Sequence, residues 1–136
     1  DNRLHLCHVF TVDDLKYLHR GGRVSKTAAI AGSILGIKPL LHVDNEGHLI
    51  PVGKIRGRKQ SIEKLVDMMC ERMGNWDNST VAVCHGDCLS DAEYAADLMR
   101  KKLGKKTTVH ICYTGAVIGS HSGPGTLALF FMGDQR

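Results

Sequence analysis

The sequence predicts an α/β (α+β) fold in which helices flank a mixed β-sheet. Three observations carry this prediction. Short apolar runs of strand length alternate with longer stretches whose apolar residues recur at helical spacing, most regularly in the second half of the chain. Glycine and Asx residues separate these segments. The chain has 136 residues, of which 43% are apolar, so it is long enough for one domain with a substantial core, and we expect a single domain over residues 1–136.

The first third of the chain predicts one strand and two short helices. Residues 4–12 alternate apolar side chains with histidines and are typical of a strand, and residues 14–19 form a short helix capped by Thr11 or Asp13. A second helix is expected over 25–35, with Ser25 as its N-cap and Gly36 at its end. The side chains of this helix are so small and apolar that another part of the protein must cover them.

The next segments predict a hairpin and then alternating helices and strands. Strands over 38–43 and 48–55 enclose an Asx/Gly turn. Helices are expected over 58–73 and 89–103, the second capped by Ser90 or Asp91, and strands over 80–85, 107–113 and 125–133. This alternation favours right-handed βαβ crossovers.

The composition narrows the classes of protein to which this chain can belong. Aromatic residues make up only 5% of the chain, which disfavours the stacking surfaces of single-stranded nucleic-acid binders. The net charge of +4 is compatible with an anionic ligand or an acidic partner. The five cysteines are odd in number, and Cys7, Cys84 and Cys112 stand in apolar runs. We therefore expect buried free thiols in a reducing compartment, hence a cytoplasmic location.

The ends of the sequence and its hydropathy add two expectations. No apolar stretch reaches the length of a membrane span, and no secretory signal is visible. The chain starts at Asp1 without a methionine and enters a strand almost at once. We therefore expect a piece of a longer protein.

A glycine-rich segment, residues 115–125, is the leading candidate site. Its four glycines and one proline predict an irregular loop between two apolar runs, with His121 among small hydroxyl residues. One interpretation is a tight turn in which His121 bonds a backbone carbonyl. The other is a ligand loop in which the glycines leave clearance for a headgroup.

Two basic segments also allow two interpretations. Arg23 lies between a glycine turn and a helix start, where it can hold a carboxylate or phosphate, or pair with Asp13 or Asp14. Residues 54–59 carry four basic side chains, which contact an anion or form a solvated loop.

Cysteine and histidine cluster at residues 84–88, Cys-His-Gly-Asp-Cys. A structural zinc site needs a second ligand pair, which does not follow downstream, so we expect no metal site and interpret the segment as a strand end and a turn. Cys88 as a nucleophile would need a base that the sequence does not fix.

Four blocks in the same order resemble the DegV family of bacterial fatty-acid-binding proteins. They are Leu15-Lys16-Tyr17-Leu18-His19-Arg20-Gly21-Gly22-Arg23-Val24-Ser25, Gly32-Ser33-Ile34-Leu35-Gly36-Ile37-Lys38-Pro39-Leu40-Leu41, Gly53-Lys54-Ile55-Arg56-Gly57-Arg58-Lys59 and Ile118-Gly119-Ser120-His121-Ser122-Gly123-Pro124-Gly125-Thr126. The resemblance covers the carboxy-terminal half of that family. It implies a DegV-type carboxy-terminal domain whose amino-terminal domain is absent here.

The resemblance implies a function. Family members bind a long-chain fatty acid between two domains and present its carboxylate to a separate ATP-binding kinase subunit, which makes an acyl phosphate for phospholipid synthesis. The carrier itself is not an enzyme and needs no cofactor. His121 would face the carboxylate and assist phosphoryl transfer. The remaining ligand residues would be Ser120, Ser122, Gly119, Gly123, Arg23, Gly22, Ile30, Ile34 and Ile37, with Arg56 and Arg58 contacting the kinase partner.

Two alternatives stay open. One is a phosphotransferase or hydrolase that uses His121 with Asp87 or Cys88, although the sequence has no phosphate loop. The other is a protein- or nucleic-acid-interaction module that uses the basic loop. The resemblance favours neither of them: it implies no nucleic acid and no stable membrane insertion. It also implies that the isolated domain self-associates through apolar surface made for its other half.

Overall fold

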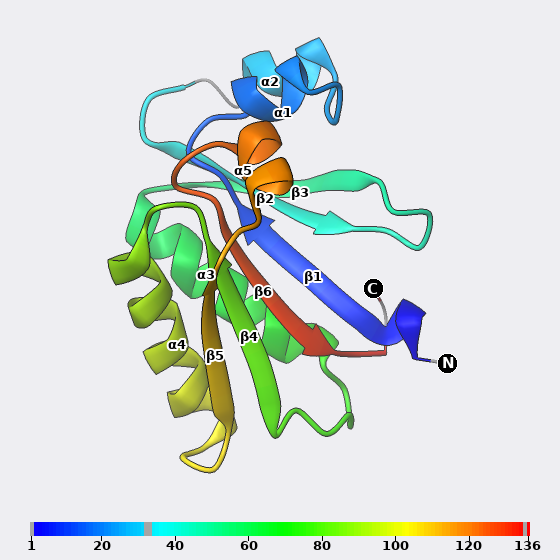
Figure 1. Cartoon of the computed structure of the whole chain (residues 1–136), viewed down its shortest axis with the longest axis vertical. Coiled ribbons are helices and arrows are strands. Elements are labelled where there is room, and N and C mark those ends of the chain that lie inside the picture. Colours follow the sequence, from blue (N-terminus) through cyan, green and yellow to red (C-terminus); the bar gives the residue numbers. More distant parts are fainter. Residues whose placement is uncertain (1, 32–33, 135) are drawn as a thin grey trace.

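A six-stranded sheet organises the chain, in the strand order β3-β2-β1-β6-β4-β5 (Figure 1). The computed structural model describes residues 2–31, 34–134 and 136. Among these residues β4 and β5 pair in parallel and the other neighbouring strands antiparallel, so the mixed sheet is confirmed. The strands are β1 (Leu6–Thr11), β2 (Ile37–Val43), β3 (Leu49–Arg56), β4 (Thr80–His85), β5 (Thr108–Tyr113) and β6 (Leu127–Met132).

The helices divide into two groups. The two long helices, α3 (Arg58–Arg72) and α4 (Leu89–Leu103), pack together and against the sheet. In Figure 1 α3 runs behind the strands and α4 lies to the left of β5. Three short helices gather at one end of the sheet: α1 (Lys16–Arg20), α2 (Lys26–Ala31) and α5 (Ala116–Ser122). A short 3-10 turn, Arg3–His5, precedes β1. None of the helices in the described residues has the length and apolar content that a membrane-spanning helix needs.

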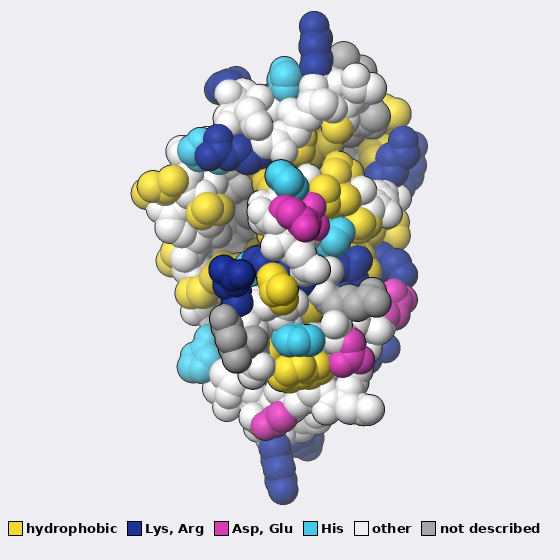
Figure 2. Space-filling view, turned by 90° about the vertical axis from the view of Figure 1, so that its right-hand side faces the viewer, with side chains coloured by type: hydrophobic (Ala, Val, Ile, Leu, Met, Phe, Trp, Pro, Cys, Tyr) yellow, Lys and Arg dark blue, Asp and Glu magenta, His cyan; other side chains and the backbone are white. Residues whose placement is uncertain are grey.

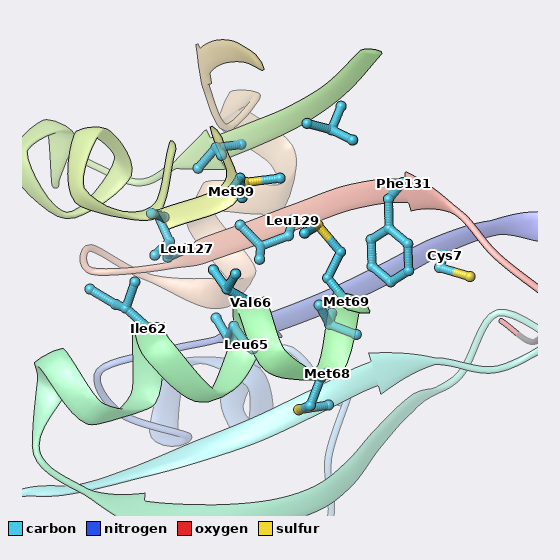
Figure 3. Close-up of a cluster of buried hydrophobic side chains, with 14 of the residues drawn as sticks. Cys7, Ile62, Leu65, Val66, Met68, Met69, Met99, Leu127, Leu129 and Phe131 are labelled. Atoms are coloured by element: carbon cyan, nitrogen blue, oxygen red, sulfur yellow. The ribbon is translucent and has the colours of Figure 1, made fainter. Parts of the chain in front are cut away.

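The main core lies between α3, α4 and the sheet. Because side chains alternate along a strand, Leu127, Leu129 and Phe131 of β6 all point to this face and are buried. Leu65 and Met69 of α3 point toward them (Figure 3). Burial of each such side chain stabilises the fold by about 1.5–3 kcal/mol, so this core fixes the sheet against α3 and α4.

The opposite face of the sheet is less covered. On β4 and β6 the residues between the core positions are only half-buried, among them Ala82, Cys84, Phe130 and Met132. In Figure 1 this face looks toward the viewer, and the short helices lie over its upper end only. A second, smaller apolar cluster, which includes Phe10, Leu18 and Leu41, anchors that end.

The glycine-rich segment is not the continuous irregular loop that we expected. Residues Ala116–Ser122 form α5, with Gly115 and Gly123 at its two ends. Gly119 is the one glycine inside the helix, and Gly123, with φ +82°, ends it while its N–H donates to the Gly119 carbonyl. The glycines therefore mark the ends of a short helix, and residues 123–126 form the turn that follows.

The predicted helix caps are partly wrong. Ser25 caps α2, since its Oγ accepts the Ala28 N–H at 3.2 Å. Thr11 instead belongs to β1 and donates to the Pro39 carbonyl at 2.7 Å, and Asp14 accepts the first N–H of α1. Neither expected residue caps α4: its N-cap is Cys88.

No disulfide joins the five cysteines, all of which lie in the described residues, but not all of them are buried as expected. Cys7 is buried, Cys84 is half-buried and Cys112 is exposed. Cys112 is exposed because β5 is the edge strand and its side chain lies on the less covered face of the sheet.

Candidate functional site

The α5 region sits at the carboxyl ends of the two parallel strands. The turn after β4 holds the chain that follows α5: the Gly86 N–H donates to the Thr126 carbonyl at 2.8 Å, and the Gly125 N–H donates to the Gly86 carbonyl at 2.7 Å. A side chain at Gly86 would stand 3.0 Å from the Gly123 carbonyl. This close backbone approach fixes residues 123–126 relative to the sheet.

The segment that contains α1 packs against the other side of α5 and its turn. The ring of Tyr17 lies against Gly123, and the carboxylate of Asp13 lies against Gly125. In the direction of a side chain, protein atoms therefore fill the space beside these two glycines, and neither leaves clearance there. Gly119 is different, because a side chain there would meet nothing within 4 Å.

His121 is half-buried on the last turn of α5, against Gly21 of the α1 segment. Its Nδ1 lies 2.7 Å from the Val117 carbonyl oxygen. A carbonyl only accepts, so Nδ1 must carry the proton in this bond. The neutral ring then offers a lone pair at Nε2, and the protonated ring offers an N–H there.

The hydroxyl groups beside His121 donate hydrogen bonds to backbone carbonyls of α5. Ser120 is exposed and donates to the Val117 carbonyl at 2.8 Å. Ser122 is 3% exposed and donates to the Ile118 carbonyl at 2.9 Å. Of the two serines proposed as ligand residues, the structure leaves only Ser120 at the surface.

Apolar side chains stand exposed beside these polar groups. Val117 is 73% exposed and Ile118 is 61% exposed, and Tyr113 at the end of β5 is 70% exposed. Exposed side chains of this size next to a half-buried imidazole can contact an amphiphilic ligand.

Arg23 does not make the acidic pair that we considered. Its Nη1 donates to the Gly21 carbonyl, so both Arg23 and His121 contact Gly21. Asp13 instead binds Lys38 at 2.9 Å, and Asp14 binds Lys16 at 3.2 Å. Gly22, next to Arg23, is exposed with open space around it.

The three isoleucines expected at the acyl chain do not form one buried wall in the described residues. Ile34 is 56% exposed between α2 and β2. Ile37 is half-buried at the start of β2, opposite Arg56. The side chain of Ile30 lies outside the described residues, as do residues 32 and 33 of the predicted helix.

The two arginines of the basic loop occupy different environments. Arg56 ends β3 and is exposed. Arg58 starts α3 with its side chain 20% exposed; its Nε donates to Asp91 at 2.8 Å and its Nη2 to the Gly125 carbonyl at 2.7 Å. Arg58 therefore holds the turn after α5 from the α3 side. Its contact with a partner stays a prediction.

The Cys-His-Gly-Asp-Cys segment forms the end of β4 and the turn after it, as expected. His85 is buried and its Nδ1 accepts the Cys88 N–H at 3.2 Å. Burial raises the pKa of the Cys88 thiol, so it is mostly protonated at neutral pH and a poor nucleophile. Asp87, with φ +54°, is exposed at the tip of the turn.

Two other surface features lie away from α5. A hollow of about 360 Å³ opens between β3 and α3, lined by apolar Leu40 and Met68 and by charged Lys54 and Arg72 among others. Asp44, Glu46 and His48 cluster within 4.8 Å at the tip of the β2–β3 hairpin, largely exposed. On the side shown in Figure 2, the Lys and Arg side chains are scattered rather than gathered into one patch, which gives the nucleic-acid alternative no support there.

The comparisons with known proteins agree with this fold. The family model of the DegV family matches residues 1–134, and the chain belongs to this family. A DegV domain-containing protein of Clostridium perfringens is 47% identical over 136 residues, which are all of this chain and 46% of the relative. The chain thus spans about half the length of the curated relatives that it matches.

Solved structures of the family show the same architecture. A fatty acid binding DegV family protein of Streptococcus agalactiae has a TM-score of 0.82 at 30% identity, over 96% of this chain and 46% of that one. DegV of Bacillus subtilis, a fatty acid binding protein, has a TM-score of 0.72 at 34% identity, over 96% of this chain and 45% of that one. The fold is also that of the Streptococcus pneumoniae fatty acid kinase B3 protein, whose structure is loaded with linoleic acid. The TM-score is 0.85 at 17% identity, over 96% of this chain and 45% of that one.

The site depends on contacts that the sequence analysis did not predict. Asp13, Tyr17 and Gly21 all face the glycine-rich segment. Their spacing of four is a helical repeat and could have indicated one shared face. Val117 was also missed: its carbonyl stands one helical turn before His121, but the segment was expected to be a loop.

Proposed function

We propose that this chain is the carboxylate-binding half of a carrier for long-chain fatty acids. The observation that carries the proposal is the geometry of His121: Nδ1 is held by the Val117 carbonyl, and Nε2 is left for a ligand. When protonated, the imidazole forms a charge-assisted hydrogen bond to a carboxylate. The family relatives that are fatty acid binding proteins support the choice of ligand.

The acyl chain would lie along the apolar surface beside His121. Val117 and Ile118 are the exposed part of this surface, and the half-covered face of the sheet extends it. A carrier needs a second wall to exclude water from a long apolar chain. We assign that wall to an amino-terminal domain that accounts for the remaining length of the relatives, with the present chain as one domain.

The carrier has no catalytic role of its own in this proposal. A separate ATP-binding kinase subunit phosphorylates the presented carboxylate, in the cytoplasm, and His121 stabilises the charge on the acyl phosphate, which then enters phospholipid synthesis. Exposed Arg56 contacts that subunit. Without its second wall, the isolated chain self-associates through its apolar face.

The deciding experiment uses the full-length protein that contains this chain. Native mass spectrometry should detect one bound fatty acid. His121→Ala should weaken oleic acid binding about 10- to 100-fold, the value of one charge-assisted hydrogen bond, and slow acyl phosphate formation. His48→Ala, at an exposed histidine of the β2–β3 hairpin away from α5, is the matched control. A protein that purifies without lipid and turns over ATP or an ester alone contradicts the proposal.

A second experiment tests the partner contact. Arg56→Ala should lower affinity for the kinase subunit and leave oleic acid binding unchanged, as measured by titration calorimetry with each ligand. Lys101→Ala, an exposed change on α4, is its control. Unchanged affinity for the kinase subunit would remove Arg56 from the interface.

A further inference from the structure

Gly21 lies directly against the imidazole of His121. A Cβ atom on Gly21 would overlap Cδ2 of that ring and stand 3.2 Å from its Cγ. Real Cβ atoms do not approach other atoms so closely, so the ring must move if residue 21 carries any side chain. The ring keeps its present place only because residue 21 is glycine.

The backbone gives no reason for glycine at this position. Gly21 has φ −79° and ψ 0°, which any L-amino acid adopts, and its N–H donates to the Tyr17 carbonyl at 3.0 Å. The next residue, Gly22, differs, because its φ of +74° favours glycine by itself. The His121 ring is the neighbour that the glycine at position 21 accommodates.

The orientation of the ring decides which nitrogen meets a ligand. The Val117 carbonyl holds Nδ1 at 2.7 Å while the ring rests on Gly21. If the ring turned to escape a side chain at residue 21, this bond would lengthen and Nε2 would point elsewhere. Arg23, whose Nη1 bonds the Gly21 carbonyl, would keep its own contact, because that contact is to the backbone.

The structure assigns Gly21 as a positioning residue for His121. It acts through the imidazole, by leaving the space in which Nδ1 stays bonded to Val117 and Nε2 stays directed at the carboxylate. The ligand part of this assignment rests on the proposed function. The ring orientation does not, and it can be measured without any ligand.

The first measurement is the Gly21→Ala variant of the full-length protein, followed by long-range ¹⁵N–¹H spectra of its histidines. The His121 signals, assigned by their loss in His121→Ala, should show a protonated Nδ1 in the unchanged protein and a shifted pattern in Gly21→Ala. Gly115→Ala is the matched control, since φ there is −58° and a side chain meets nothing within 4 Å. Identical spectra for Gly21→Ala and the unchanged protein overturn the assignment.

The second measurement is oleic acid affinity in a double-mutant cycle. Gly21→Ala should weaken binding about tenfold or more, as expected for a misdirected charge-assisted hydrogen bond, and should change nothing further in the His121→Ala background. An equal loss in both backgrounds would mean that Gly21 acts elsewhere, and overturns the assignment. The double variant also removes the clash, so it folds even if Gly21→Ala alone does not. If no variant binds oleic acid, the proposed function fails while the spectra still decide the role of Gly21.

Discussion

The ring of Tyr17 occupies the space in which residue 123 would carry a side chain. A Cβ atom on Gly123 would stand 2.5 Å from Tyr17 Cδ2 and 2.7 Å from Cγ, and the backbone there has φ +82°. Gly123→Ala should therefore combine backbone strain with overpacking and destabilise the protein by about 2–4 kcal/mol in urea unfolding. Gly22→Ala separates the two effects, because φ is +74° with open space around it, and it should cost about 1 kcal/mol. Equal losses would mean that the Tyr17 contact contributes nothing.

Arg58 should contribute more to stability than Arg56, although both belong to the basic loop. Arg58→Gln removes the bonds to Asp91 and to the Gly125 carbonyl, and the loss of such charged, part-buried bonds costs about 1.5–3 kcal/mol. Arg56→Gln changes an exposed side chain and should stay within about 0.5 kcal/mol. Chemical denaturation of both variants measures the difference. Similar stabilities would show that the Arg58 bonds are not maintained in solution.

Two neighbouring cysteines should differ in reactivity. Cys84 and Cys112 stand opposite each other on β4 and β5. Burial, and then the hydrogen bond with Cys112, raises the pKa of Cys84 to about 12. Since the thiolate is the reactive form, iodoacetamide at pH 8 should alkylate exposed Cys112 well before Cys84 in the native protein. Peptide mapping over time gives the two rates, and equal rates would contradict the raised pKa.

Acid should weaken the fold through His8. Burial, followed by the positive charge of Arg136, lowers the pKa of His8 below its ordinary value of about 6.5. The unfolded chain then binds a proton at His8 more readily than the folded one. The free energy of unfolding is therefore highest above about pH 6.5 and decreases as the pH falls toward the pKa of His8 in the folded protein. The Tm should drop between pH 7.5 and pH 5.5, and the drop should be smaller in His8→Gln. An equal drop in His8→Gln and in the unchanged protein would contradict the role of His8.

Local patterns predicted most of the fold. The helix Leu89–Leu103 was predicted with the bounds that the structure gives it, because its apolar positions repeat at helical spacing and Gly104 follows. The β2–β3 hairpin and α3 were also predicted, from an Asx/Gly turn and from helical periodicity. Such signals lie within a few residues of one another, so a single sequence is enough to detect them.

Contacts between distant segments could not be predicted in this way. The side chain of Arg58 points into the protein because it bonds Asp91 and the Gly125 carbonyl, which lie far along the chain. The segment around His121 was expected to be a loop because its glycines count against a helix, whereas in the structure two of them stand at the ends of α5. His121 as a ligand residue stays a prediction.

The pairing of β1 with β6 has a consequence for how the chain folds. These neighbouring central strands come from opposite ends of the described chain: the His5 ring and the Gly133 carbonyl, 128 positions apart, lie within 3.0 Å. Synthesis from the ribosome delivers β6 last, so α3 and α4 emerge before the strand that covers their apolar side chains. Loop-closure entropy opposes such distant pairing. The fold therefore assembles slowly and late, and a nascent chain that stops before Leu127 exposes its core to aggregation.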